Sequence, residues 1–222
     1  MLYVLVWYNL KMKPLSKINF TWSPKLAYVI GLIATDGNLS PDGRHINFTT
    51  KDIELAKIFK SFLKFRGKIG TKARGGEKDK KYYVVQPGDV IFYRFLQSIG
   101  LCPKKSKTIS KLQIHKDYFY DFLRGCLDGD GNVGFFKHPQ SRLPQFRTRL
   151  FSASEPFLNW VQNETKRRGI KGFLTKTRSV YVLAYAKRDS TKLLNLVYYD
   201  GFPSSLTRKY KVARQIMEIN KK

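Results

Sequence analysis

The feature that most constrains the fold of this chain is an internal duplication. A segment over residues 28–38 returns over residues 122–132, and a constant offset pairs Gly31 with Gly125, Asp36 with Asp130, Gly37 with Gly131, and Asn38 with Asn132. Two further similarities follow in the same order, between residues 48–67 and 150–169 and between residues 100–107 and 201–209. Matches in one order rarely arise by chance, so the chain is interpreted as a duplicated unit.

The duplication predicts an α+β fold of two pseudo-symmetric αββαβ(β)α repeats. We expect an N-terminal extension over residues 1–22, a first repeat over 23–113 and a second over 114–222. Ser23 followed by proline is typical of a helix start, and the helix over residues 25–35 should end in a left-handed turn at Gly37. Alternation predicts strands at 45–49, 81–85, 147–151 and 180–184, while 67–80 and 137–144 are expected to be basic loops.

The first helix of each repeat is apolar nearly all round and must therefore be buried. Gly31 and Gly125 are small enough to let two backbones approach closely, and the simplest arrangement packs each helix on its duplicate along a pseudo-twofold axis. This arrangement places Asp36 and Asp130 side by side at the C-terminal ends of the two helices.

Two carboxylates at this place are unfavourable, because the helix dipoles and their mutual repulsion both oppose them. Divalent cations remove both penalties. Hard oxygen ligands favour Mg²⁺, with the backbone carbonyls of Thr35 and Gly129, waters and phosphates completing the coordination. Such ions can hold a phosphodiester and activate a water. The alternative is that each aspartate only sits in an Asp-Gly turn, and the duplication argues against it.

The charge balance narrows the choice of partner. The chain has 42 Lys and Arg against 16 Asp and Glu, a formal net charge of +26, which favours nucleic acid over a basic ribosomal or membrane-surface role. Cys102 and Cys126 are expected to be small core residues in a reducing compartment. Residues 1–8 are apolar but too short to span a bilayer and lack a secretory leader, so we expect an intracellular protein that lies close to DNA.

At the duplicated segments the chain resembles the LAGLIDADG homing endonuclease family in its single-chain, two-repeat form. The motif reads at Val29–Gly37 and Leu123–Gly131, and the resemblance covers about residues 23–215. It implies a monomer whose two antiparallel sheets form a saddle over DNA. It also implies metal-dependent hydrolysis across the minor groove, which gives a staggered double-strand break at a long, imperfectly palindromic target.

The resemblance also assigns roles within the site. The last acid of each motif, Asp36 and Asp130, would bind two or three Mg²⁺ ions, with Mn²⁺ as a substitute and Ca²⁺ allowing binding without efficient cleavage. The family's earlier acid is alanine in the first copy and Asp128 in the second, which implies that Asp128 is not essential. A lysine near each metal centre is expected at Lys107 and Lys209.

Three further points complete the expected site. Lys105 and Arg208 are the alternative positions for the two lysines. A polar residue that ends the second strand, Thr50 or Ser152, would organise water. Two rival functions share the fold: a maturase that binds intron RNA for splicing, and a DNA-binding protein that does not cut.

Residues that alternate away from the core face should meet DNA, where Arg can read guanine and Asn adenine in the major groove. Basic residues of the loops and turns would contact the backbone. The expected DNA-binding residues are Asn38, Ser40, His45, Asn47, Thr49, Lys72, Arg74, Lys78, Lys80, Asn132, Lys137, Arg142, Arg147, Arg149, Lys176 and Arg178.

Overall fold

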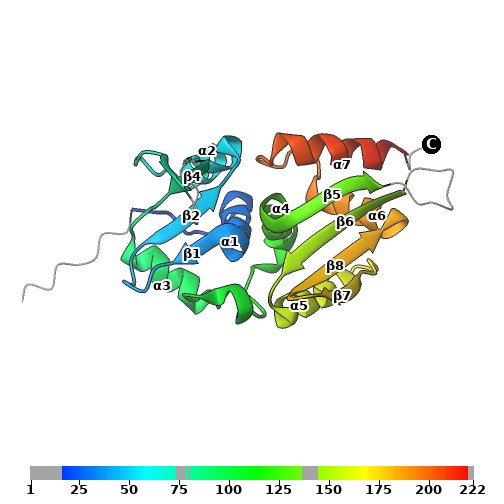
Figure 1. Cartoon of the computed structure of the whole chain (residues 1–222), viewed down its shortest axis with the longest axis horizontal. Coiled ribbons are helices and arrows are strands. Elements are labelled where there is room, and N and C mark those ends of the chain that lie inside the picture. The colour runs from blue at the N-terminus through cyan, green and yellow to red at the C-terminus, as the bar shows by residue number, and fades with distance from the viewer. Residues whose placement is uncertain (1–16, 74–78, 80, 137–144, 220–222) are drawn as a thin grey trace, which may run out of the picture.

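The computed structural model describes residues 17–73, 79, 81–136 and 145–219. Two antiparallel four-stranded sheets lie side by side, with helices α1 and α4 between them (Figure 1). The first sheet has the order β1-β2-β4-β3, with β1 (Gly37–Leu39), β2 (Ile46–Thr50), β3 (Gly70–Lys72) and β4 (Tyr82–Val85). The second has the matching order β5-β6-β8-β7, with β5 (Gly131–Phe136), β6 (Gln145–Ser152), β7 (Phe173–Thr177) and β8 (Val180–Ala186). The predicted pseudo-symmetric α+β fold is confirmed.

Helices cover one face of each sheet and leave the other face open toward the viewer of Figure 1. The helices are α1 (Pro24–Asp36), α2 (Ile53–Phe62), α3 (Val90–Ser98), α4 (Phe119–Asp130), α5 (Glu155–Lys166), α6 (Lys187–Val197) and α7 (Thr207–Ile219). Two short 3-10 helices are η1 (Lys105–Lys107) and η2 (Lys116–Tyr118). No helix within the described ranges has the length and apolar character needed to cross a membrane.

Helix α1 begins as its sequence predicts but ends differently. The Ser23 hydroxyl accepts a hydrogen bond from the Leu26 amide at 3.2 Å, and Pro24 occupies the first turn. Gly37 is extended, with φ −86° and ψ 156°, so the expected left-handed turn is wrong. Glycine is needed for space, because a Cβ there would lie 2.6 Å from the Ile33 Cα. The chain therefore passes directly from the end of α1 into β1.

Glycines hold the two central helices at backbone contact. A Cβ on Gly31 would lie 2.1 Å from the Phe122 carbonyl oxygen, and a Cβ on Gly125 would lie 2.1 Å from the Tyr28 carbonyl oxygen. These distances are too short for any side chain, so only glycine permits this approach. The reciprocal contacts confirm that each helix packs on its duplicate.

Two segments differ from the sequence-based expectations. Strand β3 lies inside residues 67–80, which were expected to be a loop, and it pairs antiparallel with β4. Residues 17–22, expected to be part of an extension, pack against the first repeat: the Lys17 and Ile18 amides donate to Asp89, and Phe20 stacks on Phe95. The expected loop at 137–144 lies outside the described residues.

Replacing Gly125 by alanine is expected to destabilise the protein, although alanine is the better helix former. The two helices would have to separate to admit the methyl group, at a cost of about 1–3 kcal/mol. Denaturant unfolding measures this change. Gly70→Ala is the matched control, since its Cβ would meet the Val84 carbonyl at 3.9 Å. A Gly125→Ala variant as stable as the parent would contradict the close packing.

Candidate functional site

The site lies where α1 and α4 end. Asp36 and Asp130 are the last residues of these helices and line the same cavity, whose volume is about 500 Å³. The other lining residues are Thr35, Gly37, Asn38, Asn47, Thr49, Lys72, Lys105 and Ser106. The helix packing therefore delivers one carboxylate from each half of the molecule to a shared polar space.

The donor set of this cavity fits a hard divalent cation. Within the described residues, no three His, Cys, Asp or Glu side chains cluster closely enough to hold a metal by themselves. Magnesium needs no such cage, because it usually takes one or two carboxylates and completes its shell with waters and substrate phosphates. Two backbone carbonyls were expected as further ligands. Thr35, which carries the first, lines the cavity. The second, the Gly129 carbonyl, accepts a hydrogen bond from the Lys209 ammonium at 3.1 Å.

Lys105 occupies the position expected of Lys107. Its side chain is 5% exposed, and its Nζ donates to the Gly37 carbonyl at 2.6 Å. Burial lowers the pKa of Lys105 to about 8, and the negative charges of Asp130 and Asp36 oppose this shift. Lys107 is exposed at the end of η1. Of the two expected positions, Lys105 therefore lines the cavity and Lys107 does not.

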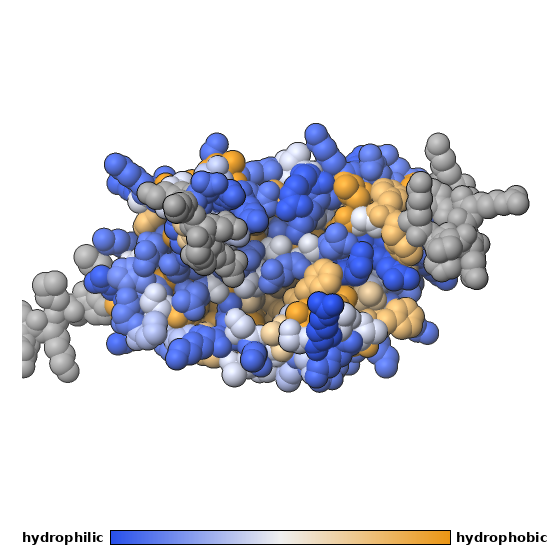
Figure 2. Space-filling model, in the orientation of Figure 1, coloured by the Kyte–Doolittle hydropathy of each residue, from blue (hydrophilic) through white to orange (hydrophobic). Residues whose placement is uncertain are grey.

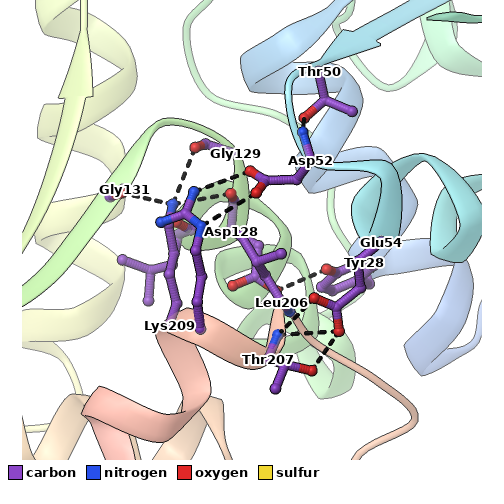
Figure 3. A network of polar contacts seen from close by, with 12 residues as sticks. Tyr28, Thr50, Asp52, Glu54, Asp128, Gly129, Gly131, Leu206, Thr207 and Lys209 are labelled. Atoms are coloured by element: carbon purple, nitrogen blue, oxygen red, sulfur yellow. Dashed lines mark hydrogen bonds and ion pairs between the residues drawn. The ribbon is translucent and has the colours of Figure 1, made fainter. Parts of the chain in front are cut away.

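Lys209 lies in the first turn of α7 and closes the end of α4 (Figure 3). Its Nζ donates to the carbonyls of Leu127, Asp128, Gly129 and Gly131, at 2.6, 2.9, 3.1 and 2.7 Å. These carbonyls carry the negative end of the helix dipole, so a buried ammonium satisfies them well. Burial lowers the pKa of Lys209 to about 8, and Asp128 opposes this shift.

The two lysines are equivalent by the duplication. Lys105 donates to Gly37 in one half and Lys209 donates to Gly131 in the other, and these glycines follow Asp36 and Asp130. Each lysine thus donates to backbone carbonyls at the C-terminal end of a central helix.

The expected water-organising residues point elsewhere. The Thr50 hydroxyl accepts from the Asp52 amide at 3.1 Å, and the Ser152 hydroxyl accepts from the Ser154 amide at 3.0 Å. Both side chains thus close the turn into the next helix. On β2 the lining residues are Asn47 and Thr49, which alternation had already placed on the outer face. Asn47 and Thr49 therefore face the cavity, and Thr50 does not line it.

The expected DNA contacts fall into distinct groups. On the open face of the sheets, Asn38 lies opposite Asn47, and Asn132 lies opposite Arg149, with Arg147 two residues earlier on β6. Hydrophilic residues dominate this face (Figure 2). Lys176 and Arg178 are exposed near the turn between β7 and β8.

The other expected contacts lie at the end of the first hairpin, in the cavity, or outside the described residues. Ser40 and His45 lie at the end of the first hairpin, where the His45 Nδ1 is 2.5 Å from the Asp42 carboxylate. Lys72 lines the central cavity. The residues outside the described ranges are Arg74, Lys78, Lys80, Lys137 and Arg142.

Asp128 is a buried structural residue. Its carboxylate accepts from the Tyr28 hydroxyl at 2.7 Å and from the Leu206 amide at 2.8 Å, so it joins α1, α4 and the start of α7. Burial raises the pKa of Asp128 to about 6, against the effect of these hydrogen bonds. Sequence reasoning missed this role, because no counterpart of Asp128 exists in the first repeat.

A family model described as a LAGLIDADG-like domain matches residues 23–100. The structure of I-DmoI in complex with DNA and Ca is similar with a TM-score of 0.58, 16% identity, and coverage of 86% of this chain and 97% of that chain. The complex of I-DmoI with DNA and Mn is similar with a TM-score of 0.53 and 18% identity, over 82% of this chain and 98% of that chain. The N-terminal LAGLIDADG domain of DUF199/WhiA is similar with a TM-score of 0.54 and 15% identity, over 86% of this chain and 88% of that chain. No curated protein matches the sequence. The structural likeness is one of fold.

Replacing Lys209 by methionine should destabilise the protein by about 1–3 kcal/mol, because buried carbonyls at the end of α4 would lose their donor. Lys211→Met, an exposed lysine of the same helix, is the matched control. Chemical denaturation of both variants tests the expectation. Equal stability of the two variants would show that the lysine is not needed to close α4.

Proposed function

The chain belongs to the LAGLIDADG family in its fold and in the sequence of its first repeat, and we propose that it is a site-specific double-strand DNA endonuclease that requires divalent metal ions. The observation that carries this proposal is the cavity that Asp36 and Asp130 share with Lys105. A protein that only binds DNA does not need two carboxylates at the negative ends of two helices, facing an anionic ligand.

The surroundings of the cavity suit DNA. The cavity opens among outward side chains of the first sheet, and hydrophilic residues cover much of that side of the molecule (Figure 2). In a chain of net charge +26, this face attracts the phosphate backbone and places it over the paired acids. A metal ion bound by the acids would supply charge neutralisation at the scissile phosphate and an activated water.

The two lysines have the complementary task. Lys105 and Lys209 lie at equivalent places under the two helix ends, one on each side of the pseudo-twofold axis. Each ammonium would stabilise negative charge near one of the two phosphodiesters to be cut. Because both sites come from one chain, the proposed endonuclease acts as a monomer.

The two halves would read different sequences. On the first sheet the outward residues of β2 are Asn47 and Thr49, whereas the corresponding strand β6 presents Arg147 and Arg149. Asparagine pairs well with adenine and arginine with guanine. The proposed target is therefore long and only loosely palindromic, as a homing role requires.

A DNA-binding protein that does not cut is the second candidate, favoured by the similarity to the LAGLIDADG domain of WhiA. Binding without cleavage of any DNA in a randomised target library, with Mg²⁺ or Mn²⁺ present, would favour it.

Replacing Asp36 or Asp130 by asparagine should abolish cleavage and preserve DNA binding, because the amide keeps the shape but loses the charge that holds the cation. A plasmid cleavage assay with Mg²⁺ and a mobility shift with Ca²⁺ measure the two properties. Asp117→Asn, in the linker before α4, is the matched control. Cleavage by the double variant, or by the parent protein in excess chelator, would refute the metal assignment.

Lys105→Met should lower the cleavage rate about 100-fold or more, whereas Lys107→Met should leave it within about twofold, because only the first ammonium lies at the cavity. Single-turnover cleavage at saturating enzyme separates this effect from weaker binding. A larger loss of cleavage rate in Lys107→Met than in Lys105→Met would instead identify Lys107 as the site residue.

A further inference from the structure

The lysine-bearing segments are fixed by contacts from the opposite repeat. Arg208 and Thr207, which precede Lys209, contact the start of α2 in the first repeat (Figure 3). The Arg208 guanidinium donates from Nε and Nη2 to the Asp52 carboxylate, at 3.2 and 3.0 Å. The Thr207 amide donates to both oxygens of Glu54 at 3.2 Å, and the Thr207 hydroxyl donates to the same carboxylate.

Glu54 acts as an N-terminal cap for α7, although it belongs to another helix. A carboxylate at a helix N-terminus satisfies a backbone amide and meets the positive end of the dipole. Lys209 lies two residues inside that helix. The position of its ammonium under α4 is therefore set by a carboxylate of the first repeat.

The same arrangement exists on the other side of the pseudo-twofold axis. Asp52 and Ser154 precede α2 and α5 at equivalent positions, and in the described chain neither side chain hydrogen-bonds to its own helix. The Ser154 hydroxyl instead donates to the Ile109 carbonyl. The Ile109 amide in turn donates to the Lys105 carbonyl at 2.8 Å. The side chain before each second helix is thus used to hold the other repeat's lysine segment.

We infer that Asp52 and Glu54 are positioning residues for Lys209, and that Ser154 is the positioning residue for Lys105. Each repeat thus aligns the lysine of the other repeat, which lies at the end of that repeat's own central helix. Asp52, Glu54, Thr207 and Arg208 form the first latch, and Ser154 with Ile109 forms the second. The role in cleavage rests on the proposed function, whereas the positioning itself does not.

The contributions within the first latch should differ. The Arg208 side chain is 61% exposed, so its ion pair with Asp52 is screened by solvent and salt. Glu54 holds a backbone amide and a hydroxyl together, and this contact fixes the first turn of α7 directly. Glu54→Gln should therefore loosen Lys209 more than Asp52→Asn does.

The first test is acetylation of lysines in the full-length protein, followed by mass spectrometry. In the Asp52→Asn/Glu54→Gln double variant, the reactivity of Lys209 should rise roughly fivefold, the change expected on loss of one helix cap, while that of Lys105 stays unchanged. Ser154→Ala should raise the reactivity of Lys105 and leave Lys209 protected. The matched control is Glu218→Gln, which breaks the pair with Arg214 at the far end of α7.

The second test follows the two strands of a supercoiled plasmid that carries the target. The double variant should cut one strand at the parental rate and the other up to about 100-fold more slowly, so that nicked plasmid accumulates while DNA affinity is unchanged. A Lys209 that stays protected, or both lysines becoming reactive together, would overturn the inference. Equal slowing of both strands would overturn the positioning role in cleavage. If the parent protein cuts no DNA, the proposed function fails and the acetylation result alone decides the latch.

Discussion

The contact between the backbones of α1 and α4 is the constraint on which the rest of the structure depends. Gly31 and Gly125 each lie against a carbonyl of the opposite helix, closer than any side chain would allow. Because both helices end at the same level, this contact brings Asp36 and Asp130 into one cavity. The duplication gives both halves the same strand order, so the two sheets extend the polar face on either side of the acids.

The lysines that satisfy the ends of the two central helices are also the lysines of the proposed site. Each central helix leaves carbonyls at its C-terminal end, and a buried lysine from the end of its own repeat donates to them. Lys105 also lines the cavity that Asp36 and Asp130 share. The buried lysines thus stabilise the negative ends of the two helices, and the same lysines take part in the proposed cleavage.

The sequence predicts the central elements well, because they depend on composition and on the repeat. Apolar helices, their glycines and the two aspartates follow from the alignment of the halves. The choice between Lys105 and Lys107 does not, because both lie in a short 3-10 helix whose orientation no periodicity reveals. The hydrogen bond from the Asp52 amide to the Thr50 hydroxyl was also missed, since it depends on a local turn at a strand end. The pairing of Arg208 with Asp52 joins residues 156 positions apart, and no local pattern indicates it.

If Asp36 and Asp130 form one cation site, both must contribute to metal binding. Mn²⁺ binding measured by electron paramagnetic resonance on the purified protein with target DNA tests this most directly. We expect tight Mn²⁺ binding that Asp36→Asn and Asp130→Asn each weaken strongly, although the two residues lie in different repeats. Unchanged Mn²⁺ binding in the variant that carries both substitutions would contradict it.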